Sequence, residues 1–227
     1  MHGLKKGIQN ALERNDLSLV AASVVKGRKV LSMLVRLSYE KETLVGWRAI
    51  LAVGMAAREL VKTEPEFLRD ACRKLLWSLN DESGGIGWSA PELLGEIVSA
   101  DTKRFADLIP LIAEAYDIEG GMFRAGVVYA LTRIGAHAPE KAASFRRIID
   151  DALAARDPLV RIRGLELAGS VSLAADRSSL WPKEYYASLK GRIKEMTQDK
   201  GEAWIYGEDG FSSVQVGDRA SDINKMF

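Results

Sequence analysis

A chain of 227 residues with 47% apolar and 28% charged side chains has the composition of a soluble globular protein. Its 32 Lys and Arg residues balance its 31 Asp and Glu residues, so the composition gives no support for binding nucleic acid through a basic face. No stretch is long and apolar enough for a membrane span, and residues 1–16 lack the pattern of a signal peptide. One cysteine excludes an intramolecular disulfide and favours a cytoplasmic location.

Taken from the N-terminus, the chain predicts two short helices that cap a stack, Leu4–Leu12 and Leu17–Val25. Amphipathic helices then recur at intervals, and the predicted ranges are Lys29–Tyr39, Glu64–Asn80, Asp101–Tyr116 and Pro139–Ala155. Pro110 lies inside the third of these and is a candidate for a kink. Cys72 lies on the apolar stripe of the second, where we expect an unreactive core thiol.

A second kind of helix alternates with the amphipathic ones. Each begins with a bulky residue, then Arg or Ser, then small and apolar residues at helical spacing. The four bulky residues are Trp47, Trp88, Phe123 and Val160, which gives a period of roughly 40 residues, the length of a two-helix repeat. Small residues such as Gly54 and Gly164 on these helices predict close approach between stacked layers.

The fourth repeat carries the most diagnostic string, Asp157-Pro158-Leu159-Val160-Arg161, followed by Gly164 and by Leu167-Ala168-Gly169. It resembles the HEAT-like repeat first described in phycobilisome lyases, whose pattern runs Asp-Pro-x-Val-Arg-x-x-Ala-x-x-Ala-Leu-Gly. The third repeat matches in part, and the resemblance covers about residues 17–175. It implies an all-α fold, a right-handed α-solenoid of helical hairpins, and leaves the function open.

The end of the chain changes character. Lys183–Gln198 predicts one more helix, and two β-prone runs around a Gly/Asp turn, 203–206 and 211–216, predict a hairpin that packs on the last helices. Asp218–Asn224 suits one further helical turn. The expected organisation is N-terminal capping helices over 1–26, HEAT-like repeats over 27–199, and a hairpin with a short tail helix over 200–227.

The most unusual segment, Trp77–Glu96, combines two tryptophans with glycines and acids. One interpretation is turn chemistry, with glycines that reverse the chain and tryptophans that fill the core. The other is a small acidic pocket, walled by the tryptophans, that binds a cation or a basic peptide. Its candidate residues are Trp77, Asn80, Asp81, Glu82, Trp88, Glu92 and Glu96, the last two being one helical turn apart.

Arg48, Arg124 and Arg161 occupy equivalent positions in three repeats and are expected to form a ladder. They either bind acids and carbonyls of the adjacent loops or present a basic stripe to an acidic partner. The two histidines, His2 and His137, are far apart in sequence, so we predict no metal site, and no pattern indicates a catalytic residue or a cofactor.

Fold analogy therefore favours a non-catalytic scaffold that binds a protein or peptide through the concave face of the inner helices and the Trp77–Glu96 region. The alternative is a HEAT-like DNA alkylation-repair glycosylase acting on methylated purines. Trp77, Asp81 and Trp88, with Arg124, superficially resemble its aromatic and acidic parts, but the near-neutral charge argues against it. A bilin lyase or lyase chaperone is suggested only by the name of the repeat. The sequence leaves the partner, the pathway and the oligomeric state open.

Overall fold

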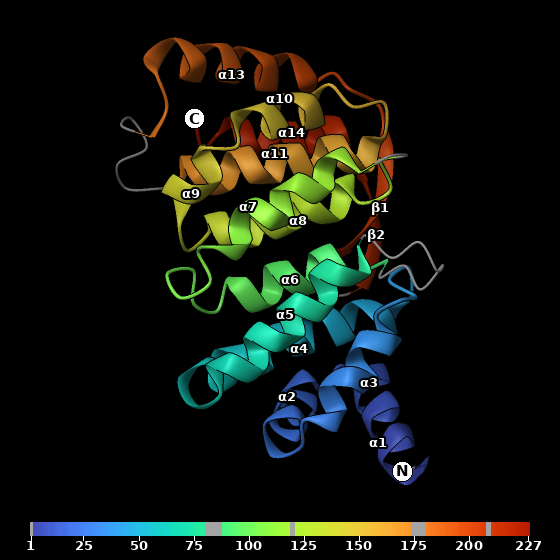
Figure 1. Ribbon diagram of the computed structural model, residues 1–227. Helices are drawn as coiled ribbons and strands as arrows, with labels where there is room; N and C mark the ends of the chain where they lie inside the picture. The colour runs from blue at the N-terminus through green and yellow to red at the C-terminus, as the bar shows by residue number, and fades with distance from the viewer. Residues whose placement is uncertain (1, 80–87, 119–120, 174–179, 208–209) are drawn as a thin grey trace. The chain divides into compact units, whose positions relative to one another are not determined.

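The computed structural model describes residues 2–79, 88–118, 121–173, 180–207 and 210–227. These residues form helices and one two-stranded antiparallel sheet near the C-terminus, so the expected all-α class with a small hairpin is confirmed. The chain divides into two compact units, Met1–Ile112 and Ala113–Phe227 (Figure 1). Within the described residues, no helix combines the length and apolar character that a bilayer crossing requires.

The first unit is built around one long helix. Its elements are α1 (His2–Glu13), α2 (Leu17–Lys26), α3 (Lys29–Leu37), α4 (Leu44–Thr63), α5 (Pro65–Ser78), α6 (Ala90–Val98) and the start of α7 (Leu108–Glu114). The central helix α4 packs against α1, α2, α3, α5 and α6. Its sequence is apolar or small around most of its circumference, as a helix surrounded by others requires.

Local hydrogen bonds fix where these helices begin. The Asp16 carboxylate accepts from the Leu19 backbone N–H at 3.1 Å before α2, and Thr43 Oγ1 accepts from the Gly46 N–H at 3.0 Å before α4. Helix α5 begins with Pro65, whose missing N–H removes no helical hydrogen bond at that position. The predicted start of each of these helices agrees with the structure to within a few residues.

The helix predicted over Asp101–Tyr116 is wrong in its first half. Residues 102–107 form turns, α7 begins only at Leu108, and a 3₁₀ turn, η1 (Ala115–Asp117), follows it. Asp101 favours the turns because its side chain accepts from the Arg104 N–H at 3.0 Å. Pro110 therefore lies in the first turn of α7, a position that tolerates proline, and not in the middle of a long helix.

The second unit repeats the plan around another central helix. Its remaining elements are α8 (Arg124–Gly135), α9 (Pro139–Ala143), α10 (Arg146–Leu153), α11 (Pro158–Ser172), α13 (Lys183–Met196), β1 (Glu202–Gly207), β2 (Gly210–Gln215) and α14 (Val216–Asn224). Helix α11 packs against α8, α9, α10 and α14. The single helix predicted over Pro139–Ala155 is interrupted at Phe145, whose ψ of 44° is not helical.

The hairpin and the last helix belong to the core of the second unit. The strands pair in register from Glu202 with Gln215 to Gly207 with Gly210. Strand β1 packs on α11 and β2 on α14, which gives a two-stranded sheet the support it lacks alone. Helix α14 is longer than the predicted single turn, because Val216, Ala220 and Ile223 are buried on it and it packs against α11 and α13.

Candidate binding groove

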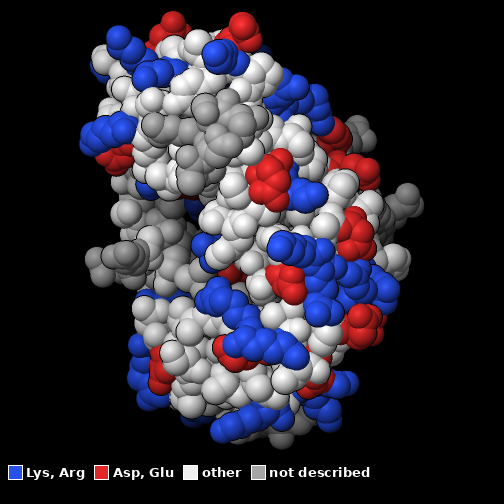
Figure 2. All heavy atoms as spheres, turned by 90° about the vertical axis from the view of Figure 1, so that its left-hand side faces the viewer, with Lys and Arg blue, Asp and Glu red and all other residues white. Residues whose placement is uncertain are grey.

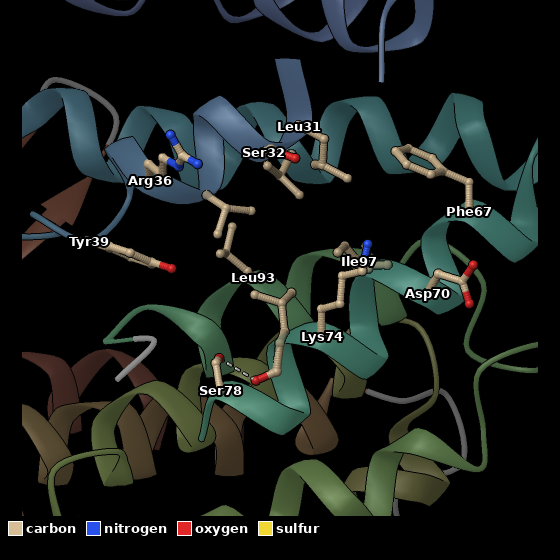
Figure 3. Close-up of a pocket in the computed structure, with 14 residues that line it drawn as sticks. Leu31, Ser32, Arg36, Tyr39, Phe67, Asp70, Lys74, Ser78, Leu93 and Ile97 are labelled. Atoms are coloured by element: carbon tan, nitrogen blue, oxygen red, sulfur yellow. Dashed lines mark hydrogen bonds between the residues drawn. The ribbon is translucent and has the colours of Figure 1, made fainter. Parts of the chain in front are cut away.

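A groove of about 310 Å³ lies between α3 and α5 in the first unit (Figure 3). Both helices rest on α4, and the space between them has an apolar floor. Val53 of α4 and Leu93 and Ile97 of α6 form this floor, and all three are buried. The volume is at the lower end of the ~300–1,000 Å³ of typical ligand pockets. It therefore suits a few apolar side chains better than a large ligand.

The walls come from a second stripe of residues on each helix. Helix α5 buries Leu68, Cys72 and Leu75 in the core. Its neighbouring stripe, at helical spacing, lines the groove with Phe67, Ala71, Lys74 and Ser78. Two of these four side chains are small, which leaves the space open. This second stripe is visible in the sequence as a further row of residues at helical spacing, but the space beside it depends on how α3 and α5 pack on α4.

The facing wall comes from α3 and the residues that follow it. Val35, Arg36 and Tyr39 line the groove from this side, and Tyr39 keeps 40% of its surface exposed. Figure 3 shows Tyr39 and Ser78 at one end of the groove and Phe67 and Asp70 at the other. Buried hydroxyl groups of Ser38 and Ser89 lie 2.6 Å apart and tie the end of α3 to the start of α6.

The charges that line the groove are unequal. Arg36 and Lys74 are exposed on opposite walls, and the side chain of neither has an ion-pair or hydrogen-bond partner among the residues that the structure describes. The carboxylate of Asp70 is bound by Arg73 Nη1 at 2.8 Å. The groove therefore offers an apolar floor between two available cations, and its one lining acid is already paired.

The expected Trp77–Glu96 site is only partly described, because Asn80, Asp81 and Glu82 lie outside the described residues. Trp77 and Trp88 are 69% and 46% exposed. The interpretation of both tryptophans as core side chains is therefore wrong. Trp77 lies in the last turn of α5 with an exposed indole, and it is not among the residues that line the groove.

Glu92 and Glu96 do not form an open acidic pocket, because every residue of α6 is buried, these two included. Glu92 Oε1 accepts from Lys41 Nζ at 2.8 Å, so its charge is compensated within the unit. Glu96 lies against α4, where a Cβ added to Gly54 would come 1.9 Å from Glu96 Oε2. Both glutamates thus belong to the packing of the first unit.

Two of the three repeat arginines bind backbone carbonyls, one at the end of a helix and the other in a loop. Arg48 Nη1 donates to the carbonyls of Leu12 and Glu13 at 2.9 and 2.8 Å, at the end of α1. Arg161 Nη1 donates to the carbonyls of Ala155 and Arg156, both at 2.8 Å. The first of the two interpretations describes these contacts.

Arg161 and Arg124 have further contacts within the second unit. Arg161 Nε donates to Asp199 at 2.8 Å. Burial opposes ionisation of Asp199, but the hydrogen bonds from Arg161 and the Gly201 N–H outweigh it and lower its pKa. Arg124 is exposed, with its guanidinium 5.3 Å from the centre of the Tyr116 ring, and it alone of the three is presented to solvent.

Elsewhere the surface is mixed in charge. Figure 2 shows one face on which Lys and Arg residues lie among Asp and Glu residues. Ion pairs of the described surface include Arg69 with Asp107 at 2.7 Å and Arg192 with Asp150 at 2.8 Å. Within the described ranges, no group of three or more His, Cys, Asp or Glu residues has the arrangement of a metal site.

The glycosylase hypothesis gains nothing from this geometry. Asp81 lies outside the described residues, and Arg124 belongs to the second unit whereas Trp77 and Trp88 belong to the first.

No protein-family model matches the chain, and no curated protein matches it. Among solved structures, the crystal structure of an engineered protein from the Northeast Structural Genomics Consortium has a TM-score of 0.59 at 14% identity, covering 98% of this chain and 89% of that one. The archaeal HEAT-like repeats protein from Thermococcus onnurineus NA1 aligns with a TM-score of 0.41 at 10% identity, covering 98% and 96%. The first likeness shows a shared fold alone, and the second is too distant to support a conclusion.

Proposed function

We propose that the protein is a non-catalytic binding module that holds a segment of a partner protein, or a peptide, in the groove between α3 and α5. The observation that carries the proposal is the second stripe on α5. Its residues Phe67, Ala71 and Lys74 line an open space above a buried apolar floor. A helix that served only the core needs no such stripe. Trp77 on the same helix is exposed, and tryptophan is among the residue types that most often anchor protein interfaces.

This surface differs from the one expected from the sequence. The inner helix α6 is buried along its whole length, so it offers no open face for a partner. The groove lies instead between the first helices of two successive pairs. The single buried cysteine suits the reducing cytoplasm, which we propose as the place of action.

The test is to fill the groove. Ala71→Trp places a large side chain into the open space, whereas Ala187→Trp makes the same change at an exposed position on α13. Wild type and both variants, each checked for helical content by circular dichroism, are used for affinity capture from the native cell. With the bait at a concentration below the dissociation constant, we expect Ala71→Trp to capture about one-tenth as much partner or less, since a blocked anchor pocket costs roughly 1.4 kcal/mol or more, a tenfold loss of affinity.

The control variant Ala187→Trp is expected to recover as much partner as the wild type. Equal recovery by Ala71→Trp and wild type would show that the groove is not the binding surface.

A further inference from the structure

The charges around the groove define the kind of segment that fits it. Arg36 on the α3 side and Lys74 on α5 face the groove from opposite walls, and neither is neutralised by a described residue. Asp70, the one acid in the lining, forms an exposed pair with Arg73 at 2.8 Å, so the two lining cations outnumber the one lining acid. A partner therefore meets a field that is positive on both sides of an apolar floor.

The length of the groove limits the shape of the segment. Its lining runs from Leu31 to Tyr39 on one side and from Phe67 to Ser78 on the other. At a rise of 1.5 Å per residue, with Ser38 and Tyr39 counted as a continuation of α3, the two walls are about 12 and 16.5 Å long. That matches about two to three turns of a bound helix, whose apolar side chains at positions i, i+3 or i+4, and i+7 meet the floor.

We infer that the occupant of the groove is an acidic amphipathic helix: its apolar stripe fills the space above Val53, Leu93 and Ile97, and carboxylates on its two flanks pair with Arg36 and Lys74. This inference rests on the proposed function and adds the chemistry of the partner. Charges at the rim of an interface contribute mainly to selection among partners, so the acidic preference is a property of Arg36 and Lys74 and not of the floor.

The experiment measures separately the contribution of the apolar floor and that of Arg36 and Lys74 to binding. A phage library of random peptides, each about three to four helical turns long, is selected on the wild-type protein. Recovered peptides are then labelled and titrated by fluorescence anisotropy. The titrations use the wild type, the blocked variant Ala71→Trp and the charge-reversal pair Arg36→Glu/Lys74→Glu. A matched pair, Lys183→Glu/Lys194→Glu, makes the same change in net charge at exposed positions of α13.

The expected result has three parts. Recovered peptides carry net negative charge around apolar residues at helical spacing, and they do not bind the Ala71→Trp variant. The Arg36→Glu/Lys74→Glu pair weakens them roughly tenfold, from the loss of two ion pairs and the repulsion that replaces them. The Lys183→Glu/Lys194→Glu pair leaves the affinity within about twofold, because neither lysine lines the groove and surface charges are screened by salt.

The two claims fail in different ways. Peptides that require the open groove but are neutral or basic, or that respond equally to both charge-reversal pairs, overturn the acidic partner and leave the binding module intact. Peptides that bind the Ala71→Trp variant as well as the wild type, or a selection that recovers none, overturn the binding module itself. If a dansyl-labelled fatty acid binds the wild type and not the Ala71→Trp variant while no peptide does, the groove takes a small amphiphilic anion instead.

Discussion

Gly54 shows how a single residue sets the distance between two helices of the first unit. A Cβ at this position of α4 would lie 1.9 Å from Oε2 and 2.9 Å from Cδ of Glu96. Glu96 is 1% exposed on a helix that is buried throughout, and its Cβ would lie 3.2 Å from the added carbon, so rotation of the carboxylate alone does not relieve the close contact. Gly191 of α13 is the opposite case, because an added Cβ there meets no atom within 4 Å.

These two glycines predict stability changes of opposite sign. Gly54→Ala is expected to lower the free energy of unfolding by about 1–3 kcal/mol, as overpacking of a filled core does. Gly191→Ala is expected to raise it by about 0.5–1 kcal/mol, since alanine loses less backbone entropy in a helix interior. Urea denaturation of both variants checks the pair. A Gly54→Ala variant at least as stable as the wild type would contradict the close approach of α4 and α6.

At the scale of elements, Arg161 joins three segments of the second unit. From the first turn of α11 it binds the loop that follows α10 and, through Asp199, the segment that leads from α13 into β1. The Arg161 and Asp199 side chains are 15% and 25% exposed, so solvent weakens this pair less than an ion pair on the open surface. Asp199 also accepts from the Gly201 N–H at 2.8 Å, which orients the entry into the hairpin.

The lowered pKa of Asp199 predicts how its contribution to stability depends on pH. A carboxyl group whose pKa is depressed in the folded state stabilises that state above its ordinary value of 3.8, and this contribution is lost as the pH falls from there through the depressed pKa. We therefore expect Asp199→Asn to cost about 1 kcal/mol of unfolding free energy at pH 7 and progressively less below about pH 4.

Urea denaturation at pH 7 and at about pH 3 measures both differences. Asp222→Asn is the control, because Asp222 also has a lowered pKa but lies in an exposed pair with Lys225 that contributes little. A cost for Asp199→Asn that is the same at both pH values would rule out an ionised role for this carboxylate.

The sequence predicted the long helices but neither interruption, and the reason is physical. Apolar periodicity describes which face is buried, and it continues through residues 102–107 and through Phe145. The breaks depend on local polar contacts that periodicity does not describe. One is the acceptance by Asp101 of the Arg104 N–H, and the other is the hydrogen bond of 2.6 Å from Ser144 Oγ to the Lys141 carbonyl at the end of α9.

The groove was harder to predict than the fold, because it depends on the separation of α3 and α5, two helices that are not consecutive in the chain. The polar groups of the expected acidic pocket were also misread. From the sequence alone, Glu92 and Glu96 were expected to be accessible, because the sequence does not show that Lys41 and Gly54 lie beside them. Tertiary packing brings those neighbours next to the two glutamates, which are therefore buried in the core and do not form a binding site.

At the scale of the whole molecule, the chain has two compact units, each organised around a central helix. In the first unit α4 contacts all five neighbouring helices, and in the second α11 contacts α8, α9, α10 and α14. We expect each unit to derive its stability mainly from the interfaces between its own neighbouring helices, as stacked-helix proteins do. A destabilising substitution in one central helix is therefore expected to lower the stability of that helix and its direct neighbours only.

Leu165→Ala tests this expectation, since Leu165 of α11 is fully buried and its truncation is expected to cost about 2–5 kcal/mol. In native-state hydrogen exchange, amides of α8, α10 and α14 are expected to lose protection, while those of α2 and α4 keep theirs. An equal loss of protection in α4 and α11 would mean that the whole chain unfolds as one cooperative body.

Because Cys72 is buried, a cysteine introduced at the rim of the groove can be labelled selectively. The Cys72 thiol is completely shielded, and desolvation raises its pKa to about 12, so at neutral pH almost none of it is the reactive thiolate. Maleimide reagents are therefore expected not to react with Cys72 in the folded state. A dye attached through one cysteine introduced at the groove rim will then report partner arrival by its emission alone, with the native thiol left in place.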